Sequence, residues 1–254
     1  MSYQPEFLET RAVIKHGQYA VIPPETRKKN VIPGFKDVDF YILASPKLGA
    51  KSTFYTATVM PGGKTTQPYQ QEGIEVFLYV HQCKAALDVK VGSQTCALTQ
   101  GGYAFVPEGT PFEFINNTEE AITIFLYRKR YERIAGHEAE IVISNIHDVK
   151  EIENGVDNVF YRDLLPDHLG FDVSILTLSF EPDGRHSGCE THVQEHCAYV
   201  ISGQGFYLLG EDWVQVKDED FIWMGPFTQQ GAYATGRTRF TYIYSKECNR
   251  EEAL

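Results

Sequence analysis

The sequence predicts an all-β protein built from two small β-barrels in tandem, with few short helices. Short β-branched and aromatic runs such as EVFLYV, AITIFLY, GFYLL and FTYIY recur along the chain, and 13% of its residues are aromatic. Gly, Pro, Asn and Asp interrupt these runs at short intervals, as in β-barrels and sandwiches rather than in βαβ units. A helical pattern is confined to the start of the chain and to residues 146–157.

An internal repeat explains why we expect two barrels. Shifting the sequence by about 121 residues places Pro61 on Pro182 and Gly63 on Gly184, and the match continues without gaps. Two copies are too few for a solenoid, so a tandem pair of barrels is the simplest interpretation.

The repeat also predicts where the domains lie. With a slightly shorter shift, the end of the first copy, IFLYRKRY, aligns with TYIYSKEC near the end of the chain. We therefore expect an N-terminal domain, a connecting segment and a C-terminal domain, at residues 1–131, 132–158 and 159–254.

Charge and composition limit the partners and the compartment. The net charge of −11 opposes binding to nucleic acids and anionic membranes, so we expect neither as a partner. The start of the chain has no apolar segment typical of a signal peptide. Five cysteines, an odd number with no CxxC pair, suit free thiols in a reducing compartment, and we expect a cytoplasmic protein.

Both copies fit one spacing pattern. The second copy reads Gly184-x5-Glu190-x-His192-x3-His196-x6-Gly203, and the first carries Tyr, Gln and Glu at the corresponding places, with Glu75 aligned with His196. This pattern resembles the two cupin motifs, in which a glycine, two histidines, a glutamate and a later histidine frame a metal in a jelly-roll barrel. The resemblance implies a bicupin, a tandem pair of such barrels.

The candidate metal site lies in the second copy. Glu190, His192 and His196 would point to one face of an extended chain, but a straight strand would hold the first and last roughly 20 Å apart. We therefore expect a bend near residues 193–195. Gln230 falls where a cupin places its last ligand. The first copy keeps one ligand-type residue of four, Glu75, so we expect its metal site to be degenerate.

This set of donors favours Mn²⁺, with Fe²⁺ second. Zinc more often takes thiolates or three histidines. A competing motif covers the same residues, because HVQEH is the H-x-x-E-H of some metalloproteases, which requires a helix. The β-rich flanks disfavour a helix, and in a strand Glu195 would point away from His192 and His196. We interpret the remaining six histidines, His186 among them, as structural.

The strand FTYIYSK adds polar side chains beside the metal site. Phe240, Tyr242, Tyr244 and Lys246 alternate along it and share one face. If Tyr242 faces the barrel interior, Lys246 reaches the rim, where its ammonium group can hold a carboxylate. Tyr207 is a second candidate of the same kind.

Beyond the cupin pattern, the chain resembles the bicupin (S)-ureidoglycine aminohydrolase family. The segments that carry this resemblance are VIPGF, GIEVFLYV, ETHVQEH, ISGQG and YIYSKECNR. The family replaces the amino group of ureidoglycine with hydroxyl during purine breakdown through allantoin, releasing ammonia and (S)-ureidoglycolate.

The resemblance implies a residue set for this reaction. The expected Mn²⁺ ligands are Glu190, His192, His196 and Gln230. The expected substrate contacts are Tyr207, Tyr242 and Lys246. We expect Glu190, through its free oxygen, to be the base for the attacking water, with Lys246 as a second catalytic residue that orients the substrate.

Two other classes of function remain open at this point. A cupin dioxygenase would use Fe²⁺ and consume oxygen, whereas a purely structural bicupin would bind no metal. The complete ligand set of the second copy disfavours the structural class. We also expect a homo-oligomer, because aromatic-rich bicupins often assemble.

Overall fold

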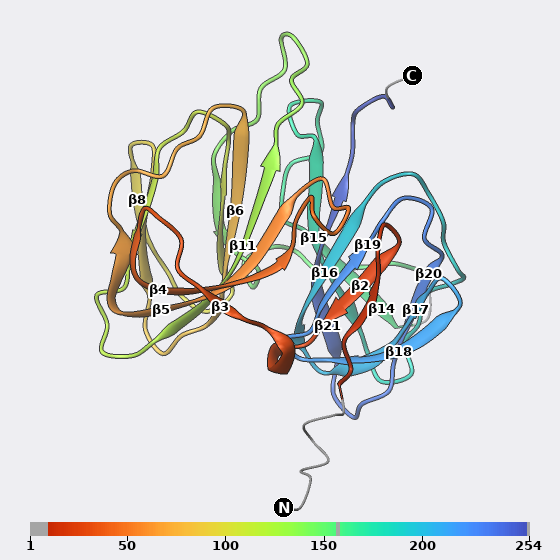
Figure 1. The fold of residues 1–254 in the computed structure, drawn as a ribbon. Coiled ribbons are helices and arrows are strands. Elements are labelled where there is room, and N and C mark those ends of the chain that lie inside the picture. Colours follow the sequence, from red (N-terminus) through yellow and green to blue (C-terminus); the bar gives the residue numbers. More distant parts are fainter. Residues whose placement is uncertain (1–9, 156–157, 253–254) are drawn as a thin grey trace, which may run out of the picture.

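The computed structural model describes residues 10–155 and 158–252, and β-strands dominate it (Figure 1). Its one helix within these residues is the single 3-10 turn η2, Pro24–Thr26, and no helix among them could cross a membrane. The strands form two packed barrel-like bodies, so the predicted all-β tandem architecture is confirmed.

The first body is one ten-stranded sheet folded on itself. Its strands are β3 (Lys29–Asn30), β4 (Phe35–Ala44), β5 (Thr53–Thr65), β6 (Ile74–Gln82), β7 (Leu87–Val91), β8 (Gln94–Leu98), β9 (Gly102–Val106), β10 (Phe112–Ile115), β11 (Ile122–Arg130) and β12 (Val142–Asn145).

The second body combines an eight-stranded and a three-stranded sheet. The larger sheet contains β1 (Val13–Lys15), β2 (Tyr19–Ile22), β13 (Ile152–Glu153), β14 (Val159–Asp163), β15 (Val173–Phe180), β16 (His196–Ser202), β19 (Phe221–Met224) and β21 (Phe240–Glu247). The smaller sheet contains β17 (Gln204–Leu209), β18 (Asp212–Lys217) and β20 (Gln230–Ala234).

The two bodies repeat one topology, as the sequence repeat predicts. Neighbouring strands run β12-β9-β6-β11-β5-β4 in the first body and β2-β19-β16-β21-β15-β14 in the second. Each central trio, β6-β11-β5 or β16-β21-β15, is antiparallel throughout. The candidate site strands β16 and β21 therefore occupy the middle of the second sheet.

Strand pairing crosses the expected domain limits. β2, from the N-terminal segment, pairs with β19 of the second body, where it lies in Figure 1. β12, from the expected connecting segment, pairs with β9 of the first body. The N-terminal segment thus joins the sheet of the second body through β1 and β2, and the segment that precedes the second body joins the sheet of the first through β12.

The helical pattern predicted over residues 146–157 is wrong. Residues 146–148 form a turn and β13 follows at Ile152–Glu153. The buried Ile146 side chain packs into the apolar layer between the bodies, and its amide donates to Gly101 O at 3.0 Å. Tertiary contacts therefore override the weak local helix preference. Residues 156–157 and the expected N-terminal helical segment up to residue 9 lie outside the described residues.

Three apolar clusters hold the molecule together. One fills each barrel and the largest lies between them. In this middle layer Phe125 of β11 stacks on Tyr199 of β16, with ring centroids 4.9 Å apart and planes 4° from parallel. The back of the site-bearing sheet is therefore fixed by the first barrel.

The expected alignment of Glu75 with His196 is wrong by one residue. Along β6, Val76 and Leu78 belong to the core of the first barrel, so alternation turns Glu75 to the opposite face. Along β16, Ala198 belongs to the core of the second barrel, and His196 shares its face. Val76 therefore occupies the place of His196, and the first barrel lacks even the ligand that the sequence alignment had assigned to it.

Candidate active site

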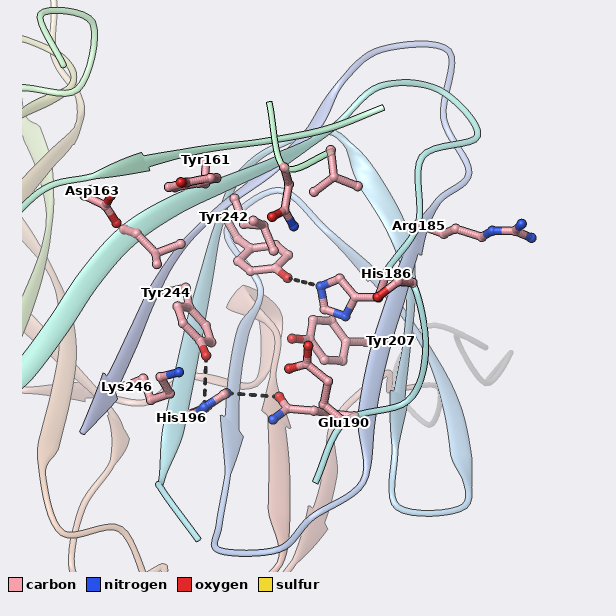
Figure 2. Close-up of a pocket in the computed structure, with 16 residues that line it drawn as sticks. Tyr161, Asp163, Arg185, His186, Glu190, His196, Tyr207, Tyr242, Tyr244 and Lys246 are labelled. Carbon is pink, nitrogen blue, oxygen red and sulfur yellow. Dashed lines mark hydrogen bonds between the residues drawn. The ribbon is translucent and has the colours of Figure 1, made fainter. Parts of the chain in front are cut away.

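A cavity of about 310 Å³ lies inside the second barrel (Figure 2). Six of the seven predicted site residues line it, namely Glu190, His196, Tyr207, Gln230, Tyr242 and Lys246. The seventh, His192, contacts Gln230 at the wall of the cavity. The structure therefore brings the whole predicted set together from β16, β17, β20, β21 and the segment before β16.

A bend before β16 positions the predicted ligands. The chain bends at Val193–Gln194, as the spacing predicted, and β16 starts at His196. Glu190, on the other side of the bend, exchanges two backbone hydrogen bonds of 2.9 Å with Gln230. Glu190 and His196 thus reach one cavity although they lie six positions apart in the sequence.

The two histidines and Gln230 form a hydrogen-bonded chain. Gln230 Nε2 donates to His192 Nε2 at 2.9 Å, and His196 Nδ1 donates to Gln230 Oε1 at 3.0 Å. The Tyr244 hydroxyl completes the chain by donating to His196 Nε2 at 2.9 Å. The ring centroids of His192 and His196 are only 4.1 Å apart.

Both imidazoles are held in the neutral form. Burial, followed by the charges of His192 and Lys246, lowers the pKa of His196 to about 2. Burial and the nearby Lys246 ammonium also lower the pKa of His192. A neutral imidazole has the lone pair that a metal ion requires, so both side chains are prepared to act as ligands at neutral pH.

The donor set fits a divalent metal ion in its chemistry. It offers two neutral imidazoles, one carboxylate and one amide oxygen on adjoining elements. Among residues 10–155 and 158–252, however, no three His, Cys, Asp or Glu side chains gather as closely as a bound ion requires. The reason is local, since the Gln230 amide bridges the imidazoles and Glu190 points toward Tyr207 (Figure 2).

Glu195 points away from this site. Its side chain is 5% exposed, and its Oε2 accepts a 2.7 Å hydrogen bond from the Lys51 backbone N–H. Burial raises the pKa of Glu195 to about 7. The HVQEH segment is not helical, and its glutamate does not lie beside its histidines. The metalloprotease interpretation is therefore excluded.

β21 supplies the opposite wall. Phe240, Tyr242 and Tyr244 pack with the second-barrel core, as their alternation predicted, and Lys246 lies half-buried beyond them at the rim. Lys246 is paired across the sheet with His196. The Lys246 ammonium group therefore lies next to the predicted metal site.

The sequence analysis missed other residues of the cavity. His186, Tyr161 and Asp163 also line it, and the Tyr242 hydroxyl lies 3.3 Å from His186 Nε2. His186, which we interpreted as structural, thus lies in the wall of the cavity. His186 lies in an irregular segment with no strand periodicity, so no sequence pattern marked its direction. The alternation placed Tyr244 on the correct face of its strand. Its hydrogen bond to His196 could be identified only from the folded structure.

The fold and cavity define a cupin-fold protein. The model of the family described as "Cupin domain" matches residues 55–127. A solved structure of a Bacillus subtilis oxalate decarboxylase mutant superposes with a TM-score of 0.66 at 9% identity, covering 94% of this chain and 79% of that one. This distant likeness concerns the fold alone.

Closer relatives define the particular family. The curated (S)-ureidoglycine aminohydrolase of Escherichia coli K12 is 43% identical over 98% of this chain and 95% of its own length. A probable (S)-ureidoglycine aminohydrolase of rice is 30% identical over 96% of this chain and 77% of its own length. The crystal structure of E. coli protein Ylba has a TM-score of 0.89 at 40% identity, with both chains fully covered. The chain belongs to the (S)-ureidoglycine aminohydrolase family of enzymes.

Proposed function

We propose that the chain hydrolyses (S)-ureidoglycine to (S)-ureidoglycolate and ammonia in purine catabolism through allantoin, with Mn²⁺ as its metal. The observation that carries this proposal is the 43% identity, over nearly the full length, to an enzyme of that name. The cavity supports it, because the residues expected for this reaction all line or contact one small space.

In this proposal Glu190, His192, His196 and Gln230 hold the ion. To hold it, Gln230 and the two imidazoles would give up the hydrogen bonds that they now make to one another. When bound, the ion supplies Lewis-acid chemistry at the substrate amine and carboxylate. Oxygen and imidazole donors in this combination suit Mn²⁺ or Fe²⁺ better than zinc.

The remaining polar residues position the substrate and move a proton. Lys246 binds the substrate carboxylate at the rim, and Tyr242 and Tyr207 orient the molecule, which reduces the entropy cost of reaching the reactive geometry. Glu190 accepts a proton from the attacking water through its free carboxylate oxygen. Glu190 is exposed, so water can reach its carboxylate.

The test couples an allantoate-hydrolysing enzyme to this protein with added Mn²⁺ and follows the enantiomers of ureidoglycolate. We expect a strong excess of the (S) product, and its loss, together with the bound manganese, in His192→Ala. The matched control is His147→Ala, an exposed histidine outside the cavity, which should keep both. Racemic product at the spontaneous rate would contradict the proposal.

Two wider parts of the proposal concern assembly and compartment. We propose a homo-oligomer, supported by the exposed side chains of Trp213 (53%) and Phe227 (67%) on the second barrel. We also propose a cytoplasmic location, supported by five cysteines that are all free thiols. Light scattering at several protein concentrations tests the first, and a monomer at all of them contradicts it.

A further inference from the structure

Two residues of the cavity wall carry a buried polar atom that has no hydrogen-bond partner among the described residues, the Tyr207 hydroxyl and Nδ1 of His186. Of the two residues, only His186 is not already among the expected substrate contacts. A buried polar atom of this kind costs stability unless a partner arrives. Because His186 lines the cavity, a bound ligand can be that partner.

The contact of His186 with Tyr242 leaves Nδ1 as the ring nitrogen open to a ligand, because the Tyr242 hydroxyl lies 3.3 Å from Nε2. We assign the tautomer in which this hydroxyl donates to Nε2 and the ring proton lies on Nδ1. Burial lowers the pKa of His186, so the ring is neutral. The side chain therefore presents an N–H donor and seeks an acceptor.

The ring is held firmly in place. The His186 backbone N–H donates to Ala232 O at 2.9 Å. Its ring packs against Phe180 at a centroid distance of 5.2 Å and against Tyr207 at 6.4 Å. A donor fixed on both sides in this way is preorganised for a particular ligand atom.

His186 and Lys246 occupy different ends of the cavity. In Figure 2, Lys246 lies beside His196 and Tyr244, whereas His186 lies across the cavity near Tyr207. A ligand with a carboxylate at the Lys246 end would place its other end against His186.

We propose that His186 is a substrate-binding residue that determines specificity, its Nδ1–H donating to the carbonyl oxygen of the ureido group. This inference rests on the proposed function for the identity of the substrate. It orients the substrate with its carboxylate toward Lys246 and its ureido end toward His186. A site built to satisfy a fixed donor rejects analogues that lack the acceptor.

Two non-reacting probes test this assignment by calorimetry on the Mn²⁺-loaded protein. N-carbamoylglycine has both a ureido group and a carboxylate, whereas glycine has a carboxylate and an amino group but no ureido group. We expect His186→Leu to weaken N-carbamoylglycine binding by at least about tenfold and to leave glycine binding unchanged. His186→Asn, whose amide N–H can take the place of Nδ1–H, should recover most of the loss.

The outcomes separate this inference from the proposed function. Equal weakening of both probes in His186→Leu, or no weakening of either, overturns it, as does failure of the wild-type protein to bind N-carbamoylglycine. Stereospecific turnover of ureidoglycine by the wild-type protein is measured separately. If turnover is absent but N-carbamoylglycine binding depends on His186, the ureido site stands and the proposed reaction fails.

Discussion

A buried ion pair between the two barrels gives the sharpest stability prediction. Lys129 Nζ lies 2.5 Å from Asp172 Oδ2, and the two side chains are 3% and 0% exposed. Glu75, also fully buried, adds a second carboxyl whose pKa is raised by burial and by Asp172. Lys129→Met would leave this acidic pair without its cation.

The expected cost follows from the burial. Removing one partner of a buried pair costs about 3–5 kcal/mol, whereas an exposed pair contributes at most about 1 kcal/mol. Lys84 and Glu120 provide a matched control, because they are 2.6 Å apart but 78% and 52% exposed. We therefore expect Lys129→Met to lose several times more unfolding free energy than Lys84→Met.

Urea denaturation at neutral pH, followed by tryptophan fluorescence and circular dichroism, measures both variants. Adding Asp172→Asn to Lys129→Met should recover part of the loss, because it removes the carboxylate left unpaired. Equal free energies of unfolding for Lys129→Met and Lys84→Met would refute the reasoning, since burial would then have no effect on the pair.

Three further predictions concern the same structure. Since the folded-state pKa of Glu75 is raised, the wild-type protein should lose stability relative to Glu75→Gln as pH rises above the ordinary carboxyl value near 4.5, which unfolding at several pH values measures. Phe125→Ala should cost about 3–5 kcal/mol in urea denaturation, because the ring stacks on Tyr199 in the middle layer, and a loss under 1 kcal/mol would contradict this packing. Cys189 is exposed, whereas burial raises the pKa of the Cys197 thiol to about 12, so mass spectrometry of the native protein should find alkylation at Cys189 first.

Periodicity made much of the fold and site predictable. The alternation along FTYIYSK identified the wall formed by Tyr242, Tyr244 and Lys246, and the spacing of Glu190 and His196 identified the bend between them. These features depend on residues close together in the sequence, where side-chain direction follows from the strand geometry.

The features that the sequence analysis mispredicted or missed depend on contacts with residues far away in the sequence. The first copy has one extra residue before β6, which turns Glu75 to the opposite face of the sheet. Because the two copies carry different residue types at these positions, aligning their sequences does not reveal this one-residue shift. The direction of His186 is set by its backbone bond to Ala232, more than forty positions along the chain. The pairing of β2 with β19 and of β12 with β9 likewise joins segments that are distant in the sequence. Local secondary-structure propensity does not predict such pairing.

This pairing has an evolutionary consequence. A protein made of one copy alone would carry a first strand directed into a neighbouring molecule, and two such molecules would form a dimer with swapped arms. Fusion of the copies turns this dimer into one chain whose halves cannot separate. Because the partner is then permanently attached, only one half must keep the residues of the candidate site. The other carries Val76 where the second barrel has His196, and it serves as a fixed support for the second barrel.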